Sequence, residues 1–326
     1  VQTIKAEPLS DTEIAATLRS YRTMPLGMSD DKDFRISIAG AQEKTALLYL
    51  SEKWHLPLGA TPSSHIFKLP IGQIVHSGMD LSDSVENEWL CHLILKAFGL
   101  PAADADMLCF LETKALVIER FDRRWSTDKS WLIRLPQEDL CQALNIPPAL
   151  KYESDGGPSI SQISDLLLGS VDSFTDRRLF MMANLVFWLL SAIDGHAKNF
   201  SIFLLAGGGF KLTPLYDVIS AFPLVAKKQL EQGRLKMAMA LTGKNRHYDW
   251  NTILHRHWLS TAKTCRFPTE EMEKIIAEML GRLDQVIAEV SAKLPDSFPD
   301  SVAGPIFNGM QMARDKLVRT KESAAM

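Results

Sequence analysis

The sequence predicts an α+β fold in two lobes, a mixed α/β lobe over residues 1–124 and a mostly helical lobe over residues 125–326. Three observations support this prediction. The chain has 326 residues, which is enough for about two packed units. Short runs rich in β-branched residues occur early, as is typical of strands. Helical stripes of apolar residues dominate after them.

The first part of the chain alternates helix and strand signals. Residues 11–22 have the pattern of a capped amphipathic helix, and residues 84–98 predict a second helix. The strand candidates are residues 45–50, 65–69, 115–119 and 131–135. This mixture of short strands and helices predicts a mixed α/β lobe.

Two apolar segments predict long helices in the second half. Residues 180–193, FMMANLVFWLLSAI, are too short to cross a bilayer, which takes ~20 residues, so we expect a buried helix. Thr175 and Asp176 are candidates for its N-cap, and the Asp-Gly turn at Asp194 ends it. Residues 270–294 place their apolar side chains on one helical stripe, which indicates a core helix.

Charge and cysteine content exclude several classes of function. A formal net charge of -3 argues against a chain that binds nucleic acid through its own charge, so any DNA contact should come through a partner. The four cysteines show no CxxC pair, which argues against a zinc site or a disulfide framework. No apolar targeting segment is recognisable at the N-terminus, and a reducing cytoplasm is the expected location.

Three polar residues near the middle of the chain have an informative spacing. Asn199 follows Asp194 by five positions, and Asp217 lies beyond two expected short strands at residues 201–205 and 209–213. In protein kinases, an Asp orients the acceptor hydroxyl, an Asn five positions later helps to hold metal, and an Asp beyond a β-hairpin binds Mg²⁺. The spacing therefore indicates phosphoryl transfer. Taken singly, each residue is more common in a turn or a helix cap.

An earlier segment suits phosphate binding. Residues 37–44, SIAGAQEK, form a small-residue turn before a strand, where backbone N–H groups can approach phosphate oxygens. The segment is not a Walker sequence, and by itself an ordinary hairpin turn is the more common interpretation.

Lys68 lies within an apolar strand candidate. A buried lysine needs a charged partner, which in a kinase is ATP phosphate together with a helix glutamate. Glu86 and Glu88 on the following helix are both candidates. The alternative is a surface lysine whose stem covers apolar groups.

Seven ordered blocks resemble the HipA family of bacterial toxin kinases between about residue 34 and about residue 224. The blocks are DFRISIAGAQEKTALL, HIFKLPIG, VIERFDRRW, RLPQEDLCQAL, KYESDGGPSI, DGHAKNFSIF and LTPLYDVISAFP. The resemblance implies a two-lobed protein-kinase-like fold and a Ser/Thr protein kinase toxin that uses ATP and Mg²⁺. It also implies a HipB-like helix-turn-helix antitoxin that binds operator DNA, and an aminoacyl-tRNA synthetase substrate such as glutamyl-tRNA synthetase.

The resemblance assigns roles residue by residue. Asp194 and Lys68 match the catalytic pair, and Asn199 and Asp217 match the Mg²⁺ ligands. The implied nucleotide-binding residues are Ala39, Gly40, Ala41, Gln42, Lys68, Glu119, Phe121, Asp122, His196, Lys198, Asn199 and Asp217. In this set, residues 119–121 correspond to the hinge that receives adenine, and Asp122 lies near the ribose.

Alternatives remain open at the hinge. Glu119 and Asp122 could instead form surface ion pairs with nearby arginines, because exposed pairs are common. The candidate partners are Arg120, Arg123 and Arg124.

Ser37 matches the serine that family members autophosphorylate. A phosphate there would add negative charge beside ATP, and we expect it to drive the loop out of the site. A hydroxyl that satisfies a turn is the alternative.

The chain departs from the family in lacking a β-rich N-terminal subdomain. We expect either a fragment of a longer toxin or a split-type toxin. Two other functions stay possible from the residues, a small-molecule kinase on the same core and a catalytically idle partner of a DNA-binding antitoxin.

Overall fold

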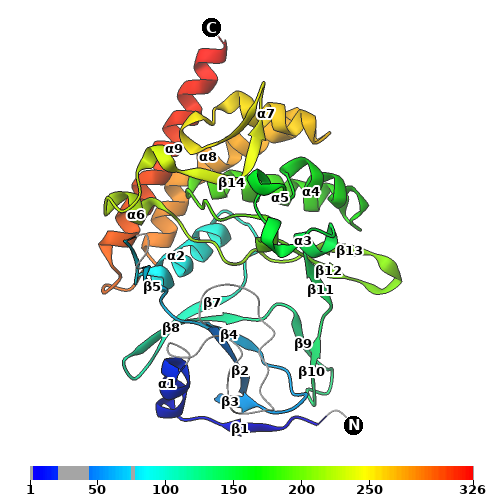
Figure 1. Cartoon of the computed structure of the whole chain (residues 1–326), viewed down its shortest axis with the longest axis vertical. Coiled ribbons are helices and arrows are strands. Elements are labelled where there is room, and N and C mark those ends of the chain that lie inside the picture. The colour runs from blue at the N-terminus through cyan, green and yellow to red at the C-terminus, as the bar shows by residue number, and fades with distance from the viewer. Residues whose placement is uncertain (1–2, 21–43, 75–77, 326) are drawn as a thin grey trace. The chain divides into compact units, whose positions relative to one another are not determined.

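The computed structural model describes residues 3–20, 44–74 and 78–325, and Figure 1 shows the course of the chain. The chain forms two compact units, Val1–Trp89 with Ala103–Leu135, and Leu90–Ala102 with Pro136–Met326. The sequence analysis set its boundary after residue 124. The first unit extends to Leu135 because strands β9 (Arg123–Trp125) and β10 (Leu132–Arg134) pair with each other. The Leu135 N–H also donates a hydrogen bond of 2.9 Å to the Asp122 carbonyl.

The first unit is built on a six-stranded antiparallel sheet with the order β1-β3-β2-β4-β8-β7. Its strands are β1 (Ala6–Pro8), β2 (Lys44–Leu50), β3 (Lys53–Pro57), β4 (His65–Lys68), β7 (Ala105–Phe110) and β8 (Thr113–Glu119). Strands β5 (Gly72–Ile74) and β6 (Met79–Leu81) pair antiparallel in a separate two-stranded sheet. The strands expected at residues 45–50, 65–69 and 115–119 are thus confirmed as β2, β4 and β8.

Helix α1 (Asp11–Ser20) covers one face of this sheet. A capping box starts it, because the Ser10 Oγ accepts from the Glu13 N–H at 3.3 Å while the Glu13 Oε2 accepts from the Ser10 N–H at 2.8 Å. Its buried side chains Ile14 and Leu18 form a core with Leu47, Phe67 and Val117 of the strands. Helix α2 (Ser84–Ala97) confirms the second predicted helix; it begins in the first unit and ends in the second.

The second unit is mostly helical. Its helices are α3 (Leu140–Ala143), α4 (Ile160–Leu166), α5 (Ser173–Leu189), α6 (Phe222–Ala226), α7 (His255–Thr264), α8 (Thr269–Ser291) and α9 (Asp300–Ala325). A three-stranded sheet, β11-β12-β13, consists of Gln137–Asp139, Ser201–Leu204 and Phe210–Leu212. Strands β14 (Lys236–Thr242) and β15 (Arg246–Asp249) form a separate pair. The predicted hairpin before Asp217 is therefore confirmed as β12 and β13.

Helix α5 is the central element of the second unit, and every residue from Phe180 to Leu189 is buried. The predicted N-cap was wrong, because the helix begins earlier than expected. Asp172 caps it by accepting a 3.3 Å hydrogen bond from the Thr175 N–H. Asp176 is buried instead, where its carboxylate accepts from the Leu212 N–H of β13 at 3.0 Å.

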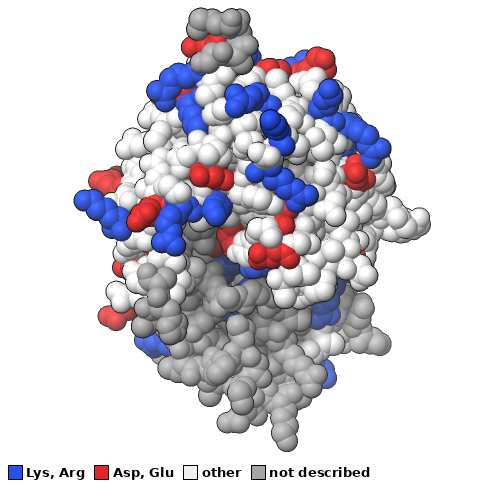
Figure 2. Space-filling view, turned by 45° about the horizontal axis from the view of Figure 1, so that its top comes forward, with Lys and Arg blue, Asp and Glu red and all other residues white. Residues whose placement is uncertain are grey.

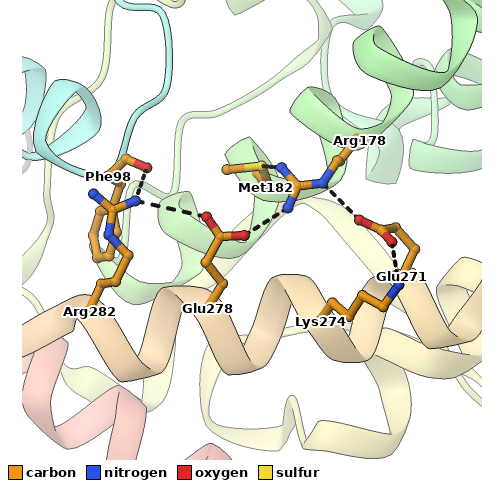
Figure 3. A network of polar contacts seen from close by, with 7 residues as sticks. All are labelled: Phe98, Arg178, Met182, Glu271, Lys274, Glu278 and Arg282. Atoms are coloured by element: carbon orange, nitrogen blue, oxygen red, sulfur yellow. Dashed lines mark hydrogen bonds and ion pairs between the residues drawn. The ribbon is translucent and has the colours of Figure 1, made fainter.

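Charged residues occur with both signs on the face shown in Figure 2, where Lys and Arg are interspersed with Asp and Glu. An arginine network, shown in Figure 3, holds α5 against α8: Arg178 contacts Glu271 at 2.8 Å and Glu278 at 2.7 Å. Arg282 of α8 donates to the Ala97 and Phe98 carbonyls at the end of α2. Within the described residues, no helix has the length and apolar character that a membrane crossing requires.

Candidate active site

The predicted site residues fall in three places. Lys68, Glu119, Phe121 and Asp122 belong to the first unit. Asp194, His196, Lys198, Asn199 and Asp217 belong to the second unit. Ser37, Ala39, Gly40, Ala41 and Gln42 lie outside the described residues.

Lys68 forms a buried ion pair in the first unit. It ends β4, between β2 and β8, and its Nζ lies 2.6 Å from the Glu88 Oε1 of α2. The two side chains are 8% and 1% exposed, so the alternative of a surface lysine is wrong. Glu86 pairs with Lys114 instead. The structure thus chooses between the two glutamates, because residues two positions apart on a helix point in different directions.

Asp122 is engaged by two arginines after the end of β8. Arg120 contacts both carboxylate oxygens, at 3.0 and 2.8 Å, and Arg123 contacts Oδ2 at 2.7 Å. Burial by itself would raise the pKa of Asp122, but these arginines outweigh it and hold the pKa below its usual value. Of the ion pairs left open by the sequence, those of Asp122 with Arg120 and Arg123 are therefore present, although Asp122 is buried and not at the surface. Glu119 is exposed at the end of β8.

Asn199 joins the loop after α5, which carries Asp194, to the segment after β13, which carries Asp217. Asn199 ends a short 3₁₀ turn and is buried. Its Nδ2 donates to the Asp194 carbonyl at 2.9 Å and to the Asp217 carbonyl at 3.2 Å. A pocket of about 40 Å³ between the two segments is lined by Phe187, Ala192, Asp194, Gly195, Asp217, Val218 and Ile219. The spacing read from the sequence thus corresponds to one site in the second unit.

Backbone conformation also supports this site. Asp217 has a φ of 60°, a left-handed conformation that is uncommon for residues with a side chain and occurs often at functional sites. A Cβ atom on Gly195 would lie 2.5 Å from the Phe187 ring, so glycine is the residue that fits at the position directly after Asp194. These two backbone constraints fix the positions from which the Asp194 and Asp217 side chains extend.

His196 and Lys198 have defined environments in the same loop. Burial lowers the pKa of His196, so the imidazole is neutral near pH 7. Lys198 pairs with Asp139 of β11 at 2.5 Å, and its carbonyl accepts from the Tyr216 hydroxyl at 2.9 Å. The Lys198 ammonium is therefore neutralised by a carboxylate that the sequence did not single out.

Tyr152 is a further residue that sequence reasoning missed. Its hydroxyl donates a hydrogen bond to Asp194 Oδ1, and its ring meets the His196 ring edge-on at 5.1 Å. Tyr152 lies in one of the resembling blocks, KYESDGGPSI, but no local pattern connects it with a residue 42 positions later.

The donor set fits a Mg²⁺ ion bound together with phosphate. Asn199 and Asp217 offer an amide and a carboxylate oxygen, and Mg²⁺ in phosphate sites takes one or two protein carboxylates with phosphate oxygens and water. Among the described residues, no group of three or more His, Cys, Asp or Glu side chains could hold a metal. Phosphate oxygens would have to supply the other ligands.

Comparisons with known proteins identify a family and related sequences. A family model described as the HipA-like C-terminal domain matches residues 36–287. The chain is 30% identical to the protein Y4mE of Sinorhizobium fredii over 315 residues, and 27% identical to the serine/threonine-protein kinase toxin HipA of Shewanella oneidensis over 304 residues. It covers 70% of the length of the first relative and 64% of the second.

Two solved structures share the fold. The HipA chain in the complex of HipA, HipB and operator DNA from Shewanella oneidensis matches with a TM-score of 0.80 and 24% identity, over 98% of this chain and 73% of that one. The proinflammatory kinase CtkA of Helicobacter pylori matches with a TM-score of 0.58 and 12% identity, over 91% of this chain and 95% of that one. The predicted two-lobed, protein-kinase-like fold is therefore confirmed.

Proposed function

The chain belongs to the HipA-like C-terminal domain family, and we propose that it is an ATP-dependent serine/threonine protein kinase, the toxin of a type II toxin–antitoxin module. The observation that carries this proposal is the junction made by Asn199, whose amide binds the backbone of both Asp194 and Asp217. Phosphoryl transfer depends mainly on positioning and charge stabilisation, and this junction supplies positioning.

Each residue then has a stated role. Asp194 orients the acceptor hydroxyl, while Asn199 and Asp217 hold Mg²⁺. Lys68 binds ATP phosphates, and its buried pairing with Glu88 supports that role, since active kinases keep a strand lysine paired with a helix glutamate. Mg²⁺ would neutralise the charge on the phosphates when bound.

The remaining nucleotide contacts follow from the resemblance. Residues 39–42 would cover the phosphates with their backbone N–H groups, and His196 and Lys198 would lie near them. Glu119 and Phe121 would receive adenine. Asp122 would lie near the ribose.

The proposed partners come from the relatives. A solved structure of a relative contains HipB and operator DNA, so we propose a HipB-like antitoxin that mediates DNA contact. The proposed substrate is a serine of an aminoacyl-tRNA synthetase, such as glutamyl-tRNA synthetase, in the cytoplasm. Ser37 is the proposed autophosphorylation site.

Incubation with radiolabelled ATP, Mg²⁺ and purified synthetases tests the proposal. We expect label on a synthetase and, by mass spectrometry, phosphate on Ser37. Asp194→Ala should abolish both while ATP binding persists, because it removes only the group that orients the acceptor. Asp296→Ala, at an exposed position, is the control. ATP binding without transfer to any protein by the wild type would instead indicate a catalytically idle partner.

A further inference from the structure

The carboxylate of Asp194 is bound on one side only. The Tyr152 hydroxyl donates to Oδ1, and His196 Nε2 lies 3.8 Å from the same oxygen. Oδ2 accepts no hydrogen bond from the described residues, and the Asp194 side chain is 59% exposed. One oxygen is thus held by the protein, and the other is open to an incoming hydroxyl.

The position of Tyr152 is set by its backbone. Its carbonyl accepts from the Asp155 N–H at 3.1 Å and from the Gly157 N–H at 2.9 Å. A Cβ on Gly157 would lie 2.6 Å from this same carbonyl oxygen, so the turn requires glycine. The next residue, Glu153, is buried and accepts from the Ala240 N–H at 2.7 Å. The phenol is therefore presented from a fixed turn.

The protonation states of the neighbours suit a neutral donor. Burial raises the pKa of Tyr152, and the hydrogen bond to Asp194 raises it further, so the phenol keeps its proton at physiological pH. His196 is neutral there, because burial lowers its pKa. Tyr152 can therefore orient the carboxylate without cancelling its charge, which a cation in the same place would do.

We propose that Tyr152 is a positioning residue for phosphoryl transfer, holding Asp194 Oδ1 so that Oδ2 receives the acceptor hydroxyl; this inference rests on the proposed function of Asp194. In the transfer, the acceptor oxygen forms a bond to the γ-phosphorus and the bond from that phosphorus to the β–γ bridging oxygen breaks, releasing ADP. The acceptor proton passes to Oδ2. The Tyr152 hydroxyl keeps its own proton throughout.

Tyr152→Phe tests this, since it removes the hydroxyl and keeps the ring that packs on His196. We expect kcat to fall by about tenfold to a hundredfold, the scale of misplaced catalytic groups, with ATP affinity within about twofold of wild type. The loss should fall on kcat and leave ATP affinity intact, which separates a positioning role from a structural one. Tyr49→Phe, at a side chain 41% exposed on β2, is the matched control and should change neither.

Three results would overturn the inference. An unchanged kcat would show that the hydroxyl does not position Asp194. A higher kcat or a lower KM for the protein acceptor would show that Tyr152 blocks the acceptor position. A parallel loss of ATP affinity would indicate only a structural role. If the wild type itself transfers no phosphate, the proposed function fails and this inference with it, whereas an active wild type matched by Tyr152→Phe refutes the inference alone.

Discussion

Asn199 shows how one side chain can hold a site together. Its amide nitrogen donates hydrogen bonds to two backbone carbonyls, those of Asp194 and Asp217. Its Oδ1 accepts no hydrogen bond from the described residues. An amide oriented by its nitrogen presents its oxygen in a fixed direction, which suits a metal ligand. Asp217, on the other side of this junction, has a φ of 60°, a left-handed conformation that is frequent at functional sites.

Asp217→Asn should weaken ATP binding in the presence of Mg²⁺ more than Asp194→Ala does. A charged ligand contributes at least ~1.5 kcal/mol, so we expect about a tenfold loss of affinity. Calorimetry with and without Mg²⁺ measures it, and affinity without metal should be unchanged. Equal affinities of the two variants would show that Asp217 is not the metal ligand.

Glu88→Gln should lower the free energy of unfolding by about 3 to 5 kcal/mol, because it leaves the Lys68 charge buried without its counter-charge. The double variant Lys68→Met with Glu88→Leu should cost less than the single one. Urea denaturation compares them. Glu289→Gln is the matched control, since its ion pair with Lys293 is exposed and should change stability by at most ~0.5 kcal/mol. A loss as small as that of the control would mean that the buried pair is not formed.

At the scale of elements, the buried helix α5 leads directly into the loop that carries Asp194. Its side chains from Phe180 to Leu189 are enclosed, and the network of Arg178 and Arg282 in Figure 3 holds α8 against α5 and the end of α2. Arginine at the C-terminal carbonyls of α2 also interacts favourably with the helix dipole. The loop that carries Asp194 therefore starts from a rigid support.

Asp172→Ala should remove the cap of α5 and lower the free energy of unfolding by about 1 kcal/mol. Asp172→Ser and Asp172→Asn keep an oxygen acceptor and should lose only a few tenths of a kcal/mol. Urea denaturation of the three variants measures this, with calorimetry to verify that ATP binding persists. Equal losses for alanine and serine would argue against a capping role.

At the scale of the whole molecule, charge limits what the chain can bind. The formal net charge is -3, and the face in Figure 2 carries both signs. Proteins bind duplex DNA by placing many Lys and Arg side chains along its phosphates, so we expect this chain alone to bind duplex DNA weakly.

Fluorescence anisotropy with labelled operator DNA should accordingly detect binding by the chain only when a helix-turn-helix antitoxin is added. Without the antitoxin, we expect affinity no better than non-specific, with Kd above about 1 μM at physiological salt. Tight, sequence-specific binding by the chain alone would contradict the charge argument and would place a DNA-reading surface within it.

The sequence by itself determined the elements with strong local patterns. The helices at residues 84–98 and 180–193, the strands β2, β4 and β8 and the hairpin before Asp217 were all predicted, because apolar periodicity and turn residues act over a few positions. Short strands such as β1 were not predicted, because an alternating pattern cannot be recognised in three residues. The N-cap of α5 was misplaced because a cap depends on where the preceding chain turns.

Only the tertiary structure decided which polar groups meet. It paired Lys68 with Glu88 and not Glu86, bound Asp122 to its arginines, neutralised Lys198 with Asp139, and brought Tyr152 to Asp194. Most of these partners are far apart in sequence, so no local period connects them. Burial makes these pairings specific, because a charge or hydroxyl that is removed from water costs free energy unless it has a partner.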